Sequence, residues 1–249
     1  MKKAEKLIII IPTYDEEAMI AVTIQALQEN IAKINGFDIS ILVFDSHSRD
    51  NTVNIIKQLQ QHYSNLYLQT EAEKSGLGSA YIQAMQYAMT ELKADVVIEY
   101  DADGSHQPHY LAPMLALLNE GYDVVLASRY LKDGGLPDNW NWYRKGLSIA
   151  GNWVARLFLT TKYTDFTSGF RITRTSCLKK IDLTQLLSKE YAYKIHLLWG
   201  LHQQEANIVE YPIIFVDRLK GYSKFPRNNI LDSLRVVIIL RWRVFRGKL

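Results

Sequence analysis

Residues 95–103 read DVVIEYDAD, a short apolar run that ends in two aspartates. The run Asp95–Tyr100 has the length and composition of a buried β-strand. Similar runs alternate with segments of helical periodicity through the first half of the chain. The other expected strands are Leu7–Ile11, Ile39–Phe44, Leu66–Leu68 and Asp123–Ala127, and the expected helices lie within Ile20–Ile34, Asp50–His62, Gly78–Leu92 and Tyr110–Asn119. This alternation predicts an α/β fold with a mainly parallel sheet and helices on both faces.

The second half of the chain is less regular. We expect helices near Gly146–Leu159 and Tyr191–His202, a strand near Ile208–Phe215 and a turn-rich stretch over Asp165–Arg171. No internal repeat, low-complexity stretch or linker-like composition divides the chain. The sequence therefore predicts a single domain over residues 1–228, followed by a helical C-terminal segment over residues 229–249.

The composition excludes several classes of protein. With 48% hydrophobic and 22% charged residues, the 249-residue chain can bury a core, which excludes global disorder. Its single cysteine, Cys177, excludes a disulfide framework and fits a reducing compartment. The N-terminal apolar run Leu7–Ile11 is short, and no apolar run approaches the roughly 18 residues that a membrane span needs.

The charge is unevenly distributed along the chain. The formal net charge is +3, yet residues 230–249 alone carry +4, from five basic residues against Asp232. A near-neutral body with a cationic end argues against a nucleic-acid partner, which favours basic charge spread along one face. In the C-terminal segment arginines alternate with Val, Ile, Leu, Trp and Phe, a pattern typical of an interfacial helix on a membrane surface. The alternative is a helix packed on the domain, with arginine stems covering apolar surface.

The strongest chemical signal is Asp101-Ala102-Asp103, at the end of the expected strand. Ligands of open parallel sheets bind at the carboxyl ends of the strands. Two carboxylates there can hold Mg²⁺ or Mn²⁺, which would bridge to phosphate oxygens. A solvated turn is the simpler interpretation of the same residues, because Asp and Gly are common in turns. On spacing alone the turn is favoured over the metal site.

Other polar segments follow the expected elements in a specific order. They are Pro12–Glu16, Asp45–Thr52, Lys74–Gly78, Ser128–Tyr130, Arg144–Lys145, Thr167–Arg171, Glu210–Pro212 and Asp217–Lys224. In this order they resemble the family 2 inverting glycosyltransferases of the A-type fold. Within that family the pattern is most similar to the polyprenol-phosphate glycosyltransferases of the dolichol-phosphate mannose synthase kind. The resemblance extends over nearly the whole chain, so residues 1–228 would form the catalytic domain.

The resemblance implies that a nucleotide-sugar site is built from the first half of the chain. Pro12, Tyr14 and Glu16 match the segment that lines the nucleoside pocket in the family. Asp45 matches the acid that contacts the base. Lys74 is a further candidate for donor binding, although a solvated loop charge explains it equally well.

The same resemblance assigns metal-binding and catalytic residues. Asp101 and Asp103 match the acidic pair that positions the nucleotide and its Mg²⁺ or Mn²⁺. The cations that match the family's phosphate-binding positions, and would contact the acceptor phosphate, are Arg129, Arg144, Arg218 and Lys224. Arginine suits this role because its guanidinium gives paired, permanently charged hydrogen bonds. We expect catalysis to depend on Asp101, Asp103, Arg129 and Arg144.

Together the matches imply a metal-dependent enzyme that moves a hexose from a nucleoside diphosphate sugar, with GDP-mannose favoured, to a polyprenyl phosphate. A phosphomonoester is largely ionised at neutral pH, since its second pKa lies near ~6, so it can attack without a strong base. We expect the protein to act peripherally at the cytoplasmic face of a membrane. Its basic C-terminal segment or a separate membrane-anchor subunit would hold it there.

Other functions fit parts of the pattern. These are a glycosyltransferase of the same fold with a UDP-glucose-type donor or a soluble or polysaccharide acceptor, a nucleotidyltransferase, and an inactive nucleotide-binding module. The chain also departs from the family pattern. Ser46 replaces a second acid, Ser105 stands where some members have Gln beside the metal, and His196 replaces a Glu in the late helix. Gly76-Leu77-Gly78 is either a helix-entry turn or part of a phosphate cradle.

Overall fold

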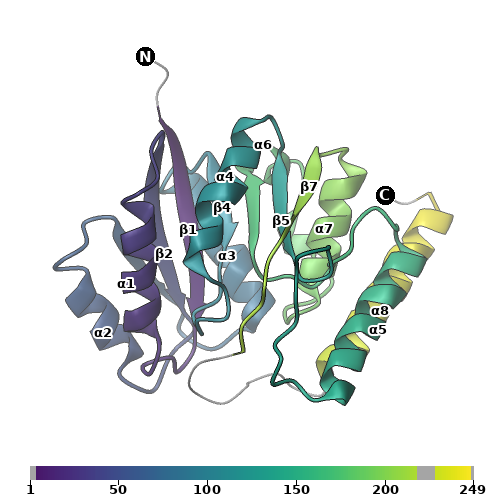
Figure 1. Cartoon of the computed structure of the whole chain (residues 1–249), viewed down its shortest axis with the longest axis horizontal. Helices are drawn as coiled ribbons and strands as arrows, with labels where there is room; N and C mark the ends of the chain where they lie inside the picture. The colour runs from purple at the N-terminus through teal and green to yellow at the C-terminus, as the bar shows by residue number, and fades with distance from the viewer. Residues whose placement is uncertain (1–3, 218–227, 248–249) are drawn as a thin grey trace.

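Strand β1 (Glu5–Thr13) lies inside a seven-stranded sheet with the order β3-β2-β1-β4-β6-β5-β7 (Figure 1). The computed structural model describes residues 4–217 and 228–247. Strand β6 is antiparallel to both of its neighbours, and the other paired strands are parallel. The remaining strands are β2 (Phe37–Asp45), β3 (Leu66–Thr70), β4 (Val96–Glu99), β5 (Val124–Ser128), β6 (Arg171–Arg174) and β7 (Ile208–Pro212). The predicted α/β fold with a mainly parallel sheet is confirmed.

Helices cover both faces of the sheet (Figure 1). Packed on one face are α1 (Ile20–Ile31), α2 (Thr52–Leu59) and α4 (Leu111–Asn119), and on the other α3 (Leu77–Thr90), α6 (Thr175–Leu178) and α7 (Tyr193–Gln203). Short 3₁₀ turns occupy Pro108–Tyr110 and Leu183–Gln185. Helices α5 (Trp142–Phe158) and α8 (Asn228–Phe245) lie side by side at one end of the molecule.

The N-terminal strand shows why its sequence is a continuous apolar run. Ile9 and Ile11 pack into the core beneath α1 and α4, whereas Ile8 and Ile10 pack into the core beneath α3. Successive side chains of a strand point to opposite faces. Because helices cover both faces of this sheet, every position of the strand from Leu7 to Pro12 is apolar.

Strand β6 is an element that the sequence did not predict. Its sequence, RITR, follows a turn-rich stretch and carries a charged residue at each end. Arg171 is nevertheless buried, with Nη2 2.6 Å from Glu99 Oε2 on β4. Arg174 Nη1 lies 2.5 Å from Glu5 Oε1 on β1. Both charges are thus paired within the sheet, which a pattern of apolar residues cannot reveal.

Helix α8 has one packed side and one exposed side. Val236, Val237 and Leu240 are buried and pack with Ala155 of α5 and Leu198 of α7. Apolar side chains that remain exposed on α8 are Ile230, Leu231, Leu234, Ile238, Trp242 and Phe245. Packing on the domain is therefore observed for one side of this helix, and contact of its exposed side with a membrane stays a prediction. Within the described residues, no helix combines the length and hydropathy required to cross a bilayer.

Candidate active site

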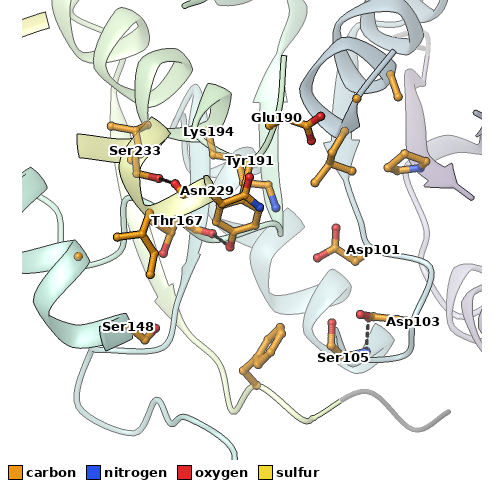
Figure 2. A pocket seen from close by; sticks show the side chains of 18 of the residues that line it. Asp101, Asp103, Ser105, Ser148, Thr167, Glu190, Tyr191, Lys194, Asn229 and Ser233 are labelled. Atoms are coloured by element: carbon orange, nitrogen blue, oxygen red, sulfur yellow. Dashed lines mark hydrogen bonds between the residues drawn. The ribbon is translucent and has the colours of Figure 1, made fainter. Parts of the chain in front are cut away.

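A cavity of about 840 Å³ lies at the carboxyl edge of the sheet, beside the ends of β1, β4 and β5 (Figure 2). The strand order reverses between β1 and β4, which is the usual place for a ligand in an open α/β sheet. The predicted site residues that line the cavity are Pro12, Tyr14, Glu16, Lys74, Asp101, Asp103, Arg129 and Arg144. The structure therefore brings most of the predicted set into the lining of one cavity.

The loops that follow β1 and β2 are tied to each other. Asp15 N donates to Ser48 Oγ at 2.9 Å, and Glu16 N donates to Thr52 Oγ1 at 2.9 Å. Asp15 has a φ of 51°, in the left-handed region that aspartate tolerates better than most residues. These bonds fix the backbone of residues 14–16 at the edge of the cavity.

Asp45 lies beneath this wall and does not line the cavity. Its buried carboxylate accepts hydrogen bonds from Thr13 Oγ1 at 3.0 Å and from Ser48 N at 2.9 Å. The next residue, Ser46, lines the cavity, and Ser46 N donates to Thr13 O at 2.8 Å. Asp45 thus organises the loop after β2, and its expected contact with a base stays a prediction.

Lys74 has a defined place in the cavity wall. Its ammonium lies 3.5 Å from the centroid of the Tyr14 ring, a cation–π contact. Lys74 is also exposed, so its expected role in donor binding stays a prediction beside that of a solvated loop charge.

The two glycines after Lys74 allow another chain segment to approach closely. A Cβ at Gly76 would lie 2.5 Å from Lys189 O, and one at Gly78 would lie 2.7 Å from Glu190 O. Ser79 N also donates to Lys189 O at 3.1 Å. The glycine pair therefore serves packing at the start of α3, as the helix-entry interpretation expects.

Asp101 is held in place by two buried side chains. Tyr81 Oη donates to Asp101 Oδ1 at 3.1 Å. Asp101 N donates to His106 Nδ1 at 3.2 Å, while His106 Nε2 lies 3.7 Å from Asp101 Oδ2. Burial lowers the pKa of His106, although the Asp101 charge opposes this shift. Because Nδ1 accepts from Asp101 N, the ring proton is assigned to Nε2, which faces the carboxylate.

Asp103 follows on the same turn, and both aspartates line the cavity (Figure 2). Asp103 Oδ1 accepts a hydrogen bond from Ser105 N at 3.0 Å. The described residues contain no cluster of three or more His, Cys, Asp or Glu side chains that could hold a metal. Two carboxylates still fit Mg²⁺ or Mn²⁺, because such ions often take one or two protein carboxylates and fill their shell with water and substrate phosphates.

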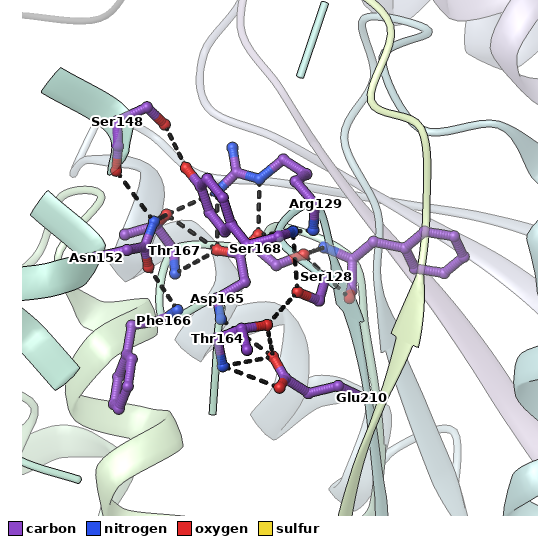
Figure 3. Close-up of polar contacts among 12 residues, drawn as sticks. Ser128, Arg129, Ser148, Asn152, Thr164, Asp165, Phe166, Thr167, Ser168 and Glu210 are labelled. Carbon is purple, nitrogen blue, oxygen red and sulfur yellow. Dashed lines mark hydrogen bonds and ion pairs between the residues drawn. The ribbon is translucent and has the colours of Figure 1, made fainter. Parts of the chain in front are cut away.

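Arg129 is buried and paired with Asp165 (Figure 3). Its Nε and Nη2 donate to the two carboxylate oxygens of Asp165 at 2.7 and 2.8 Å, and Nη2 also donates to Thr167 Oγ1 at 2.7 Å. Burial acts to raise the pKa of Asp165, but the Arg129 guanidinium holds it below its usual value. Most of the fork expected to bind phosphate is thus used inside the protein, and Nη1 makes no hydrogen bond to a described residue.

The loop that carries Asp165 is anchored from two other elements (Figure 3). Glu210 of β7 accepts hydrogen bonds from Thr164 N at 2.9 Å and from Asp165 N at 3.0 Å. Asn152 Oδ1 of α5 accepts from Phe166 N at 2.8 Å. The sequence segment around Glu210 therefore supports the cavity indirectly, by fixing the loop that positions Arg129.

Arg144 lies in the first turn of α5, at the edge of the cavity. Its guanidinium carbon is 3.8 Å from the centroid of the Trp140 ring, and its Nη1 is 3.6 Å from Asp217 Oδ1. The side chain is 46% exposed, so a ligand phosphate can reach it. The other two predicted phosphate-binding residues, Arg218 and Lys224, lie outside the described residues.

His196 lies apart from the cavity lining. Its Nδ1 accepts a hydrogen bond from Leu187 N at 3.0 Å. Burial, together with the positive charge of Arg243, lowers the pKa of His196 to about 4. This departure from the family pattern is therefore a neutral packing residue, not part of the cavity wall.

The cavity also has a part that the sequence did not indicate. Tyr191, Lys194, Ser148 and Phe215 also line it. Beyond them the wall becomes apolar, formed by side chains of α5, α7 and α8: Leu147, Val154, Ile195, Ile230, Leu234 and Val237. Helical periodicity predicts that some of these residues are buried, but only the packing of the three helices brings them to one cavity.

Comparison with known proteins identifies relatives along the whole chain. A family model described as "Glycosyl transferase family 2" matches residues 8–182. Polyprenol monophosphomannose synthase of Mycolicibacterium smegmatis is 32% identical over 250 residues, which cover 100% of this chain and 91% of that protein. Undecaprenyl-phosphate mannosyltransferase of Micrococcus luteus is 33% identical over 237 residues, which cover 95% of this chain and 93% of that protein.

Solved structures show the same fold. Glucosyl-3-phosphoglycerate synthase from Mycobacterium tuberculosis, in complex with Mn²⁺, uridine diphosphate and glucosyl-3-phosphoglycerate, matches with a TM-score of 0.64. The match covers 96% of this chain and 81% of that one, at 19% identity. At this identity the likeness concerns the fold alone, and it confirms the expected A-type arrangement.

Proposed function

This chain belongs to glycosyltransferase family 2, and from that premise we propose that it transfers a hexose, with inversion, from a nucleoside diphosphate sugar to the phosphate of a polyprenol. Mannose is the proposed sugar, because both curated relatives are named for mannose transfer to polyprenyl phosphates. GDP-mannose is the donor that the family resemblance favours.

One observation carries the proposal: a single cavity joins the acidic pair to an apolar wall between α5 and α8. Asp101 and Asp103 lie at one part of it, and Leu147, Ile230 and Leu234 lie at another. A sugar nucleotide carries no hydrocarbon chain to bury, whereas an isoprenoid chain gains free energy by leaving water for apolar surface. The joined surfaces favour an acceptor that carries a phosphate and a hydrocarbon tail.

The donor would lie against the loops that follow β1, β3 and β4. Tyr14, with Lys74 over one face of its ring, would form a wall for the nucleoside. Asp101 and Asp103 would hold Mg²⁺ or Mn²⁺, which would supply positive charge to stabilise the departing diphosphate. Tyr81 and His106 keep the Asp101 carboxylate oriented toward the cavity.

The acceptor phosphate would enter from the side of α5. Arg144 at the cavity edge and Nη1 of Arg129 would hold it by charge-assisted hydrogen bonds. A phosphate oxygen that is already ionised can attack the anomeric carbon from the face opposite the diphosphate, in a single displacement. The sugar configuration is then inverted, and no side chain has to remove a proton.

Identification of the products tests the proposal. The protein is incubated with Mn²⁺, a short-chain polyprenyl phosphate and either GDP-mannose or UDP-glucose, and free mannose replaces the lipid in a parallel reaction. We expect GDP and a polyprenyl-phosphate mannose of inverted anomeric configuration, identified by mass spectrometry and NMR. Transfer only to the soluble sugar would contradict the lipid acceptor, and release of pyrophosphate would instead indicate a nucleotidyltransferase.

A lipid acceptor requires the cavity to meet a membrane, and we propose that α5 and α8 form the contact. Both helices lie at one end of the molecule (Figure 1) and expose apolar side chains next to arginines. Arg156 lies over Trp153, and Arg246 lies over Trp242. Such surfaces bind at the boundary between headgroups and acyl chains of anionic lipids. The proposal includes peripheral association at the cytoplasmic face.

Substitution of these side chains is expected to weaken membrane binding. The double variants Trp153→Ser/Leu157→Ser and Trp242→Ser/Phe245→Ser should each bind vesicles of phosphatidylcholine and phosphatidylglycerol at least about tenfold more weakly than the wild type in co-sedimentation. Val22→Ser is the matched control, because Val22 is 52% exposed on α1, away from these helices. Equal binding by all variants would contradict the proposed contact.

A further inference from the structure

Lys194 is a buried cation in the cavity wall that the proposed mechanism leaves without a role. The side chain lies in the first turn of α7 and is 1% exposed. Its Nζ makes no hydrogen bond to a described residue and lies 4.4 Å from the centroid of the Tyr191 ring. Lysine is almost never buried without a partner, because removal of an ammonium from water is costly. The position of Lys194 therefore needs a physical reason.

The reason lies in what faces the ammonium group. A Cβ at Gly169 would be 2.5 Å from Lys194 Nζ and 2.7 Å from Asp101 Oδ2, so both atoms flank the same point. His106 Cε1 would lie 3.1 Å from that Cβ, and Arg129 is near enough to affect the same imidazole. Figure 2 shows Lys194 beside Tyr191 on the side of the cavity where Asp101 lies. The only residue that leaves room for this approach is a glycine.

We propose that Lys194 is a fixed internal cation of the donor site, which attracts a nucleoside diphosphate before any metal ion binds and weakens binding of a free divalent ion to Asp101 and Asp103. This inference rests on the proposed function, because it assumes that the diphosphate enters this cavity. A positive charge near the Asp101 carboxylate repels a second cation and attracts an anion. The divalent ion then enters with the nucleotide, whose phosphates bring the negative charge that offsets Lys194.

Two binding measurements on the full chain test the proposal. Mn²⁺ alone is titrated by electron paramagnetic resonance, and GDP and UDP are titrated by calorimetry in EDTA. We expect Lys194→Gln to bind Mn²⁺ roughly tenfold more tightly than the wild type, and the preferred nucleotide roughly tenfold more weakly. Partial unfolding would weaken both, so the opposite signs distinguish the charge effect from structural damage.

Matched variants complete the design. Lys189→Gln removes the same charge from an exposed lysine that does not line the cavity, and it should change neither constant. Lys194→Met repeats the measurement with an apolar side chain of similar length, in case Lys194→Gln does not fold. Two unchanged constants, or two that move in the same direction, would overturn the role of Lys194. A wild type that binds neither nucleotide, with or without Mn²⁺, would instead refute the proposed function, and the Mn²⁺ titration would still test Lys194.

Discussion

The Asp103→Ala variant is expected to lose at least about 10³-fold in kcat/KM while it remains folded. Asp103 is one of two carboxylates in the cavity that fit a divalent ion. Its removal takes away one of the two negative charges that would hold that ion. The side chain is partly exposed, so its removal should change the stability of the fold little. The main loss is the hydrogen bond from Ser105 N, which contributes about 1 kcal/mol to the free energy of unfolding. Initial rates with GDP-mannose and polyprenyl phosphate over a range of Mn²⁺ concentrations measure the effect.

The Asp103→Asn variant separates charge from structure. Its amide oxygen can still accept the hydrogen bond from Ser105 N, so its thermal unfolding should match that of the wild type. Its activity should nevertheless fall almost as far as that of Asp103→Ala, because an amide oxygen carries no net charge. Near-normal turnover by either variant would show that the acidic pair does not hold the ion, and the mechanism proposed here would have to be abandoned.

The sequence predicted the part of the fold that local pattern determines. Strands β1, β2 and β4 each contain an apolar run because both faces of the sheet are buried, so their composition alone identifies them. Parallel strands also bring their carboxyl ends to one edge, and for this reason the sequence alone places Tyr14 and Asp101 close together. The start of α5 differs from the expected Gly146: Asn141 Oδ1 accepts from Arg144 N at 2.8 Å, and the helix begins at Trp142.

The remaining features of the fold and of the site depend on contacts between residues far apart in the sequence, which leave no local sequence pattern. The RITR strand β6 was missed because its arginines are neutralised by Glu99 and Glu5, far away in the sequence. The local sequence does not distinguish Lys194 from other helical lysines, because its approach to Asp101 depends on a glycine in a different loop. The apolar half of the cavity exists only because α5, α7 and α8 pack together.

The Asp165→Ala variant is expected to lose about 3–5 kcal/mol in the free energy of unfolding, the cost of leaving one member of a buried ion pair alone. Asp165 is fully buried and accepts from Nε, Nη2 and the backbone N of Arg129 and from Thr167 N. Its removal would leave the Arg129 guanidinium in the interior without a counter-charge. Urea denaturation followed by circular dichroism measures the loss, and a change below about 0.5 kcal/mol would contradict the expected dependence on this pair.

The double variant Arg129→Met/Asp165→Leu decides what Arg129 does beyond this pairing. Replacing both members of a buried pair with apolar groups is often neutral for stability, so the double variant should recover most of what Asp165→Ala loses. If Arg129 only anchors the loop that carries Asp165, a stable double variant would keep its activity. We expect instead a stable protein whose KM for polyprenyl phosphate rises about tenfold or more, because Nη1 of Arg129 can no longer bind the acceptor phosphate. Unchanged KM and kcat in that variant would limit Arg129 to structure and leave Arg144 as the phosphate ligand.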